Sequence, residues 1–160
     1  MSAEPFLFDD LSVGLILTAE CEYHITRDEI VEVASRWDPQ PFHLDEEAAA
    51  SSHFGGLVAS GLHTLAASMQ LGSRERPATA AVAGLGLDEL RILAPVRPGD
   101  RLRQTTEIVG LRPSASRPDR GIVRGRRIVR NQEGTDVLTY LLMWMVRRAA
   151  HDVSDCRTRL

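Results

Sequence analysis

The stretch Asp38-Pro39-Gln40-Pro41-Phe42-His43-Leu44-Asp45 carries the most information in this sequence. Its two prolines favour extended or turn conformations, so the stretch is not expected to continue a helix. Asp38 and His43 are then expected to converge on one small volume. A carboxylate and an imidazole that share a water molecule form a general acid–base pair. The stretch is also compatible with a surface turn in which His43 has only a structural role.

A second feature lies 17 residues after His43, where Ser60-Gly61 opens an apolar, helix-like run. The backbone N–H groups at a helix start can donate hydrogen bonds to an oxygen that gains negative charge, and a glycine leaves them uncovered. A base, an acid and an oxyanion donor are therefore available between residues 38 and 61.

These segments together resemble the signature of the MaoC-like (R)-specific enoyl-CoA hydratases and dehydratases. The matching residues are Asp38, Gln40, Pro41, His43 and Asp45, then Phe54-Gly55-Gly56, Ala59-Ser60-Gly61, the segment 90–100 and the polar turn 129–134. The resemblance covers about residues 10–148. Gln40 stands where the family has Asn, and Ser60 stands where it often has His. The reaction class is therefore better supported than the substrate.

The resemblance implies a lyase that adds water to a 2-enoyl thioester, or removes it from an (R)-3-hydroxyacyl thioester. Asp38 would take a proton from water, His43 would hold that water and help return a proton to C2, and the Gly61 N–H would bond the thioester oxygen. Ser60 and Gln40 are expected to assist in substrate binding. The expected pocket residues are Trp37, Phe42, Phe54 and His63.

Structural roles stay open for several of these residues. Trp37 and Phe42 are equally compatible with simple core anchors, Gly61 with close packing of a helix on a sheet, and His63 with a structural role. His53 is expected to be solvated.

No cofactor is implied, since coenzyme A would be part of the substrate, and no metal-ligand spacing is evident. The partners implied are an acyl-CoA or acyl-carrier-protein thioester and a second copy of the chain. The homodimer would bound the substrate tunnel with both chains and bring residues 85–91 near the partner. The alternatives are an acyl-CoA thioesterase and a non-catalytic subunit of a dehydratase heteromer.

The 160 residues are expected to form one domain over residues 1–150, followed by a polar tail at 151–160. The net charge of −3 gives no indication of a nucleic-acid-binding surface. All 19 basic residues are arginines. Six of them could meet coenzyme A phosphates, although a solvated sheet face explains most of them better: Arg112, Arg117, Arg120, Arg124, Arg126 and Arg127.

The N-terminus lacks the pattern of a secretory signal, and the apolar run from Val137 to Val146 is too short to span a bilayer. Cys21 and Cys156 do not define a disulfide framework. The sequence therefore predicts a cytoplasmic protein without membrane contact.

The pattern along the chain predicts an α+β fold. Thr26 is expected to cap a helix that ends near Arg36, and Asp45 a short helix over 46–51. A buried helix is expected over about 57–71, and residues 73–79 are expected to form a polar loop. The expected strands are 16–25, 80–94, 101–111, 121–131 and 135–146. This layout resembles the hot-dog fold, an antiparallel sheet wrapped around a central helix.

Overall fold

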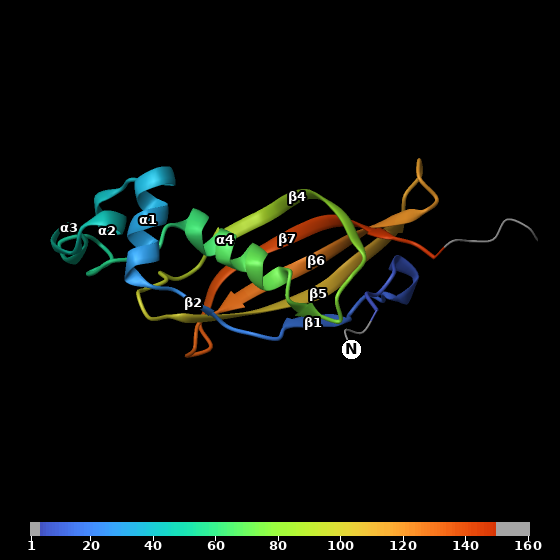
Figure 1. Cartoon of the computed structure of the whole chain (residues 1–160), viewed down its shortest axis with the longest axis horizontal. Helices are drawn as coiled ribbons and strands as arrows, with labels where there is room; N and C mark the ends of the chain where they lie inside the picture. The colour runs from blue at the N-terminus through green and yellow to red at the C-terminus, as the bar shows by residue number, and fades with distance from the viewer. Residues whose placement is uncertain (1–3, 150–160) are drawn as a thin grey trace, which may run out of the picture.

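The computed structural model describes residues 4–149. A seven-stranded sheet curls along one long helix, α4 (Gly61–Gly72), as Figure 1 shows. Three further helices gather at one end of the molecule: α1 (Arg27–Trp37), α2 (Pro41–Leu44) and α3 (Glu46–Ala50). The tail predicted for residues 151–160, which includes Cys156, lies outside the described residues.

The strands pair antiparallel in the order β3-β1-β5-β6-β7-β4, and β2 also pairs with β5. This arrangement confirms the predicted α+β layout. The strands are β1 (Ile16–Ala19), β2 (Tyr23–His24), β3 (Glu75–Arg76), β4 (Ala81–Ile92), β5 (Arg101–Pro113), β6 (Arg120–Arg130) and β7 (Asp136–Arg147), and a 3-10 turn η1 (Phe8–Asp10) precedes them.

The core lies between α4 and the inner face of the sheet. Ala67 and Leu71 of α4 belong to one buried cluster with Leu102, Val129 and Leu138 of the strands. On β6 the buried positions alternate, because successive side chains of a strand point to opposite faces. Burial of this apolar surface is the main force that holds the helix on the sheet.

The strand predicted over residues 16–25 is interrupted. Thr18 pairs with Thr105, and Tyr23 pairs with Leu102. The first segment therefore advances five residues where β5 advances only three. The two extra residues leave the ladder and split the segment into β1 and β2. The predicted polar loop 73–79 contains β3, which adds to the edge of the sheet by pairing with β1.

Two helix predictions also needed correction. The buried helix begins at Gly61 and not near Leu57, because the Ala59 N–H donates to the Val96 carbonyl and Ser60 takes the N-cap position. Residues 41–44 form one helical turn, with Pro41 at a first-turn position where its missing N–H costs nothing. The Thr26 and Asp45 caps are confirmed, since each side chain accepts a bond from a backbone N–H two or three residues into its helix.

In the part of the chain that the structure describes, no helix is both long and apolar enough to cross a membrane.

Candidate active site

Asp38 and His43 meet at the end of the molecule where the short helices gather. Asp38 is the C-cap of α1, and His43 lies in the single turn of α2. The His43 Nε2 atom is 3.5 Å from the Asp38 Oδ2 atom. The imidazole is 8% exposed and the carboxylate 33%, so the pair is sheltered but open on one side.

A backbone carbonyl determines which nitrogen of the His43 ring carries the hydrogen. The His43 Nδ1 atom lies 2.7 Å from the Val58 carbonyl oxygen, which can only accept, so we infer that Nδ1 carries the hydrogen and donates it. In the neutral ring, Nε2 then presents a lone pair toward Asp38. A single water molecule beside the pair can donate one hydrogen to each of these two acceptors. That water would be polarised for loss of a proton.

The pair opens into a cavity of about 440 Å³, a size within the range of small-molecule sites. Phe42 and Phe54 line the cavity and pack on each other with their ring centroids 5.1 Å apart. The Phe42 ring also meets the His43 ring edge-on at 4.5 Å. The Phe42 ring therefore restricts the movement of the imidazole.

Gly61, the first residue of α4, lines the same cavity. Outside the hydrogen bonds within α4 itself, the Gly61 N–H donates to no backbone carbonyl of residues 4–149. The positive end of the helix dipole adds to its attraction for a developing negative charge. A Cβ atom at this position would collide with Ile92 Cδ1, so the glycine also serves packing against β4.

The structure does not bring every predicted site residue to the cavity. Ser60 is buried, and its hydroxyl accepts a bond from the His63 N–H as the α4 cap. Gln40 is exposed and precedes α2. The Trp37 side chain is 69% exposed and is not among the cavity residues, so in the single chain it forms no wall of the site.

His63 faces α1 instead of the cavity. Its Nε2 atom lies 3.4 Å from Glu29 Oε1, without the geometry of a hydrogen bond, and both ring nitrogens lack a bonded partner among residues 4–149. Glu29 accepts a hydrogen bond from the Tyr23 hydroxyl. Burial, assisted by this carboxylate, raises the pKa of Tyr23 to about 12.

Several cavity residues escaped the sequence analysis. His53, expected to be solvated, is exposed but lines the cavity, as do Thr64 and the segment 92–96. Arg97 follows that segment and donates to the Phe54 carbonyl at 2.7 Å. The signal for the end of this strand was Pro95, which has no N–H to donate and follows shortly after β4 ends at Ile92.

The predicted arginine cluster does not lie at this cavity. The β5–β6 hairpin that carries it extends toward the opposite end of the molecule from α2 and α3 (Figure 1). Arg127 is buried within the fold, contrary to both expectations for it. Among residues 4–149, no three His, Cys, Asp or Glu side chains come together as metal ligands.

Comparisons with known proteins identify the family to which the chain is similar. A family model described as "MaoC like domain" matches residues 13–129. The uncharacterized protein YdeM of Bacillus subtilis is 29% identical over 88% of this chain and 98% of its own length. The 3-hydroxybutyryl-CoA dehydratase of Methylorubrum extorquens is 37% identical over 69% of this chain and 68% of its own. The mesaconyl-CoA hydratase of Cereibacter sphaeroides is 43% identical, but over 42% of this chain and only 20% of that protein.

Solved structures give the same result. A MaoC-like dehydratase from Rhodospirillum rubrum superposes with a TM-score of 0.84 and 39% identity, over 91% of this chain and 99% of that chain. The protein RV0216 of Mycobacterium tuberculosis, described as a double hot-dog fold, gives a TM-score of 0.79 over 91% of this chain and 45% of that chain. At 21% identity this second match shows the fold alone, and it confirms the predicted hot-dog fold.

Proposed function

We propose, because this chain belongs to the family of MaoC-like domains, that it is a hydro-lyase for 2-enoyl and (R)-3-hydroxyacyl thioesters with Asp38 and His43 as its catalytic pair. The observation that carries the proposal is the 3.5 Å approach of these two side chains at the mouth of a cavity. Relatives named as dehydratases and hydratases support the reaction class.

In the hydration direction, Asp38 removes a proton from the bound water as the water oxygen bonds to C3. The electron pair of the C2–C3 double bond moves toward the thioester, and the charge collects on the thioester oxygen. The Gly61 N–H donates to that oxygen, a contact that strengthens as charge develops. The proton held by the pair then returns to C2, so water has been added and no other reactant is consumed.

His43 has a distinct task in this scheme. Its Nδ1–H is engaged with the Val58 carbonyl, so its Nε2 lone pair is directed to the water and not lost to ring rotation. A water molecule that donates both hydrogens to these acceptors keeps its oxygen lone pairs free, and one of them attacks C3. Positioning of this kind makes the attack effectively intramolecular.

The thioester carrier is coenzyme A or an acyl carrier protein, and both carry phosphate. We propose that Arg97 contacts this phosphate, since it is exposed and adjoins the cavity through Phe54.

We also propose that the chain forms a homodimer through β4, which is the sheet edge opposite β3. The β4 strand exposes five apolar side chains: Val82, Leu85, Leu87, Leu90 and Ile92.

The test is a direct absorbance assay with a panel of enoyl-CoA thioesters and a thiol reagent in parallel. Hydration removes the conjugated enoyl absorbance and releases no thiol. Release of free thiol at the rate of absorbance loss would instead identify a thioesterase. Absence of either change across the panel would identify a non-catalytic subunit.

A further inference from the structure

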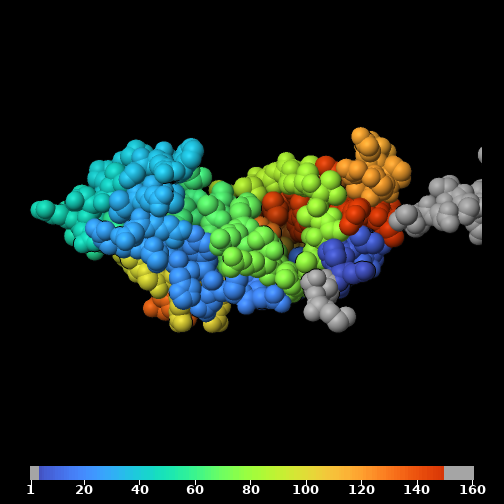
Figure 2. Space-filling view, in the orientation of Figure 1, coloured from blue at the N-terminus to red at the C-terminus, as the bar shows by residue number. Residues whose placement is uncertain are grey.

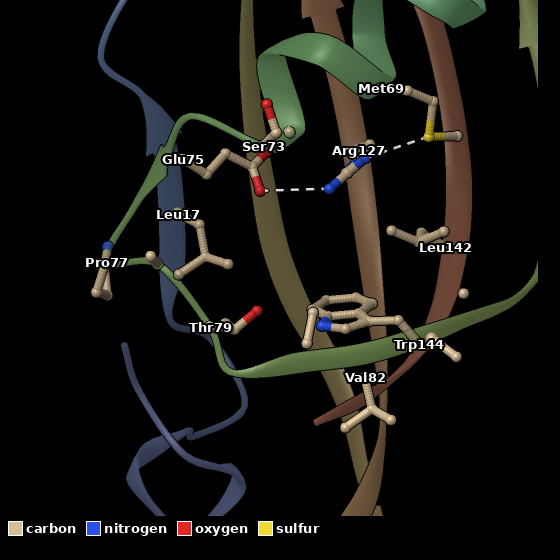
Figure 3. Close-up of a pocket in the computed structure, with 15 residues that line it drawn as sticks. Leu17, Met69, Ser73, Glu75, Pro77, Thr79, Val82, Arg127, Leu142 and Trp144 are labelled. Atoms are coloured by element: carbon tan, nitrogen blue, oxygen red, sulfur yellow. Dashed lines mark hydrogen bonds and ion pairs between the residues drawn. The ribbon is translucent and has the colours of Figure 1, made fainter. Parts of the chain in front are cut away.

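A second cavity, of about 380 Å³, lies at the other end of α4. Most of its wall is apolar, with Leu17, Met69, Val82 and Trp144 around it (Figure 3). Glu75 and Arg127 form the polar part of the wall, joined by the ion pair drawn in Figure 3. The catalytic scheme above makes no use of this pair.

The pair is nearly withdrawn from solvent. The Arg127 side chain is 9% exposed and the Glu75 side chain 5%. Arg127 Nε donates to Thr106 Oγ1 at 3.1 Å, and Nη1 donates to the Tyr140 hydroxyl at 3.2 Å. Glu75 Oε1 accepts from Gln104 Nε2 at 2.7 Å and from the Thr106 hydroxyl. These bonds hold both groups in fixed positions.

The remaining atoms of the pair are poorly satisfied. Within residues 4–149, Arg127 Nη2 and Glu75 Oε2 have only each other, at 3.5 Å. A guanidinium nitrogen has two N–H donors and a carboxylate oxygen has two acceptor sites, so both retain capacity. Buried polar capacity of this kind is costly unless a partner fills it. The cavity therefore presents one donor and one acceptor side by side.

The last turn of α4 is adapted to this arrangement. A Cβ atom on Gly72 would lie 2.5–2.7 Å from three atoms of the Arg127 guanidinium, so only glycine leaves room for it there. The negative end of the helix dipole at the same turn favours the cation. The position of Arg127 against α4 is thus set by two elements far apart in the sequence.

Both cavities lie along the seam between α4 and β4. At the catalytic end Gly61 adjoins Ile92, and at the other end Met69 and Val82 line the second cavity. The space-filling view shows the surface hollowed between α4 and β4, with β7 visible at the bottom (Figure 2). The 12 residues of α4 set the separation of the two ends at about 18 Å. On β4, Ile92 lines the first cavity and Val82 lines the second.

We propose that the second cavity receives the distal end of the acyl chain and selects chains that end in an uncharged hydroxyl or carboxamide group. Such a group donates to Glu75 Oε2 and accepts from Arg127 Nη2 at once. A terminal methyl would leave both atoms unsatisfied, a terminal carboxylate would face Glu75, and an ammonium would face Arg127. The substrate class rests on the proposed hydro-lyase function, whereas the binding chemistry rests on the cavity alone.

Binding is tested without thioester chemistry. The chain has two tryptophans, so Trp37→Phe leaves Trp144, a cavity residue, as the sole indole reporter. We expect 1-hexanol to change its fluorescence saturably and to bind about tenfold more tightly than hexyl methyl ether, which cannot donate. Equal affinities, or no saturable change, would overturn the proposal.

Two variants assign that preference to the ion pair. Glu75→Gln with Arg127→Leu removes both charges together, which avoids leaving one buried charge unpaired. Gly72→Ala keeps both charges but displaces the guanidinium. Each is expected to melt cooperatively and to lose the preference for the alcohol. Retention of the preference in the folded double variant would show that another part of the cavity creates it.

Turnover then tests the acyl assignment. Pairs of enoyl-CoA thioesters of equal length, with and without a terminal hydroxyl, are expected to differ about tenfold in kcat/KM in the parent and hardly at all in the double variant. Equal kcat/KM values in a parent that binds hexanol selectively would overturn the acyl assignment and leave the hydro-lyase function intact. Failure to turn over any thioester, with selective hexanol binding retained, would reject the hydro-lyase function and the acyl assignment together.

Discussion

His43 Nε2 lies 3.5 Å from Asp38 Oδ2, although Asp38 caps the end of α1 and His43 lies in α2. The separation is set by backbone features on both sides. Asp38 ends α1 as its C-cap, and its N–H still bonds to the Ala34 carbonyl. The His43 ring is held by a hydrogen bond to the carbonyl of Val58, which lies in the segment before α4. Three chain segments thus meet at the Asp38–His43 pair, beside the proposed position of the water.

Asp38→Asn and His43→Ala should each lower thioester hydration by about 10²- to 10⁴-fold, the usual contribution of a general acid–base group. Asp38→Asn should keep the parent's melting temperature within a few degrees because Asp38 is partly exposed, whereas His43→Ala should lower it moderately because the buried Val58 carbonyl loses its partner. Asp28→Asn and His24→Ala are matched controls on exposed side chains and should retain full turnover. Near-parental turnover in either site variant would remove that residue from the catalytic pair.

Gly61→Ala should lose activity for two separable reasons. Its methyl group would collide with Ile92 Cδ1, and the same methyl group would lie beside the N–H group that the thioester oxygen is proposed to approach. The double variant Gly61→Ala with Ile92→Ala relieves the collision and should recover the melting temperature. The methyl group remains beside the N–H group in the double variant, so if this N–H group is the oxyanion donor, the methyl keeps the thioester oxygen away and kcat should stay depressed, since loss of one such contact costs about 2.7–4 kcal/mol. Full recovery of kcat with stability would instead assign Gly61 to packing alone.

Arg97→Gln should raise KM for coenzyme A thioesters about tenfold, because a charge-assisted bond to phosphate contributes about 1.5–3 kcal/mol. The same variant should leave KM unchanged for an N-acetylcysteamine thioester, which has no phosphate. Arg112→Gln, in the hairpin directed away from the site, is the matched control and should change neither value. An equal rise of KM for both substrates would mean that Arg97 acts only by holding the Phe54 loop.

The chain should form a homodimer through β4, measured by light scattering at several concentrations. Leu87→Glu places a charge on this exposed sheet edge and should shift the mass toward the 17.7 kDa monomer. Val13→Glu makes the same change on another exposed apolar side chain and should leave the dimer intact. A parent that is monomeric and active would contradict the interface.

Stability should fall as the pH rises from about 10 to about 12, the interval between the ordinary pKa of a phenol and that of Tyr23 in the fold. In this interval the unfolded chain has released the Tyr23 proton while the folded chain still holds it, so rising pH favours unfolding. Tyr23→Phe should reduce the slope of unfolding free energy against pH in this interval. An unchanged slope in urea titrations would place the alkaline sensitivity elsewhere.

Local sequence determined much of this protein. Alternating and helical apolar patterns predicted the central helix and the four long strands, because each needs one face in the core. Thr26 and Asp45 marked helix starts, since capping depends on a side chain and an N–H only three residues away. The convergence of Asp38 and His43 followed from two prolines in a short segment.

Tertiary structure decided what depends on distant segments. Glu75 reaches Arg127 only because β3 joins the sheet edge and α4 ends in Gly72, and no local pattern encodes that meeting. The one sign of this contact in the sequence was the alternation along β6, which puts Arg127 on the same inward face as Val123 and Val129. Trp37 directly precedes Asp38 in the sequence, yet within residues 4–149 it stays largely in solvent. Neighbouring residues determine the local backbone conformation, whereas the burial of a side chain depends on which remote element packs over it.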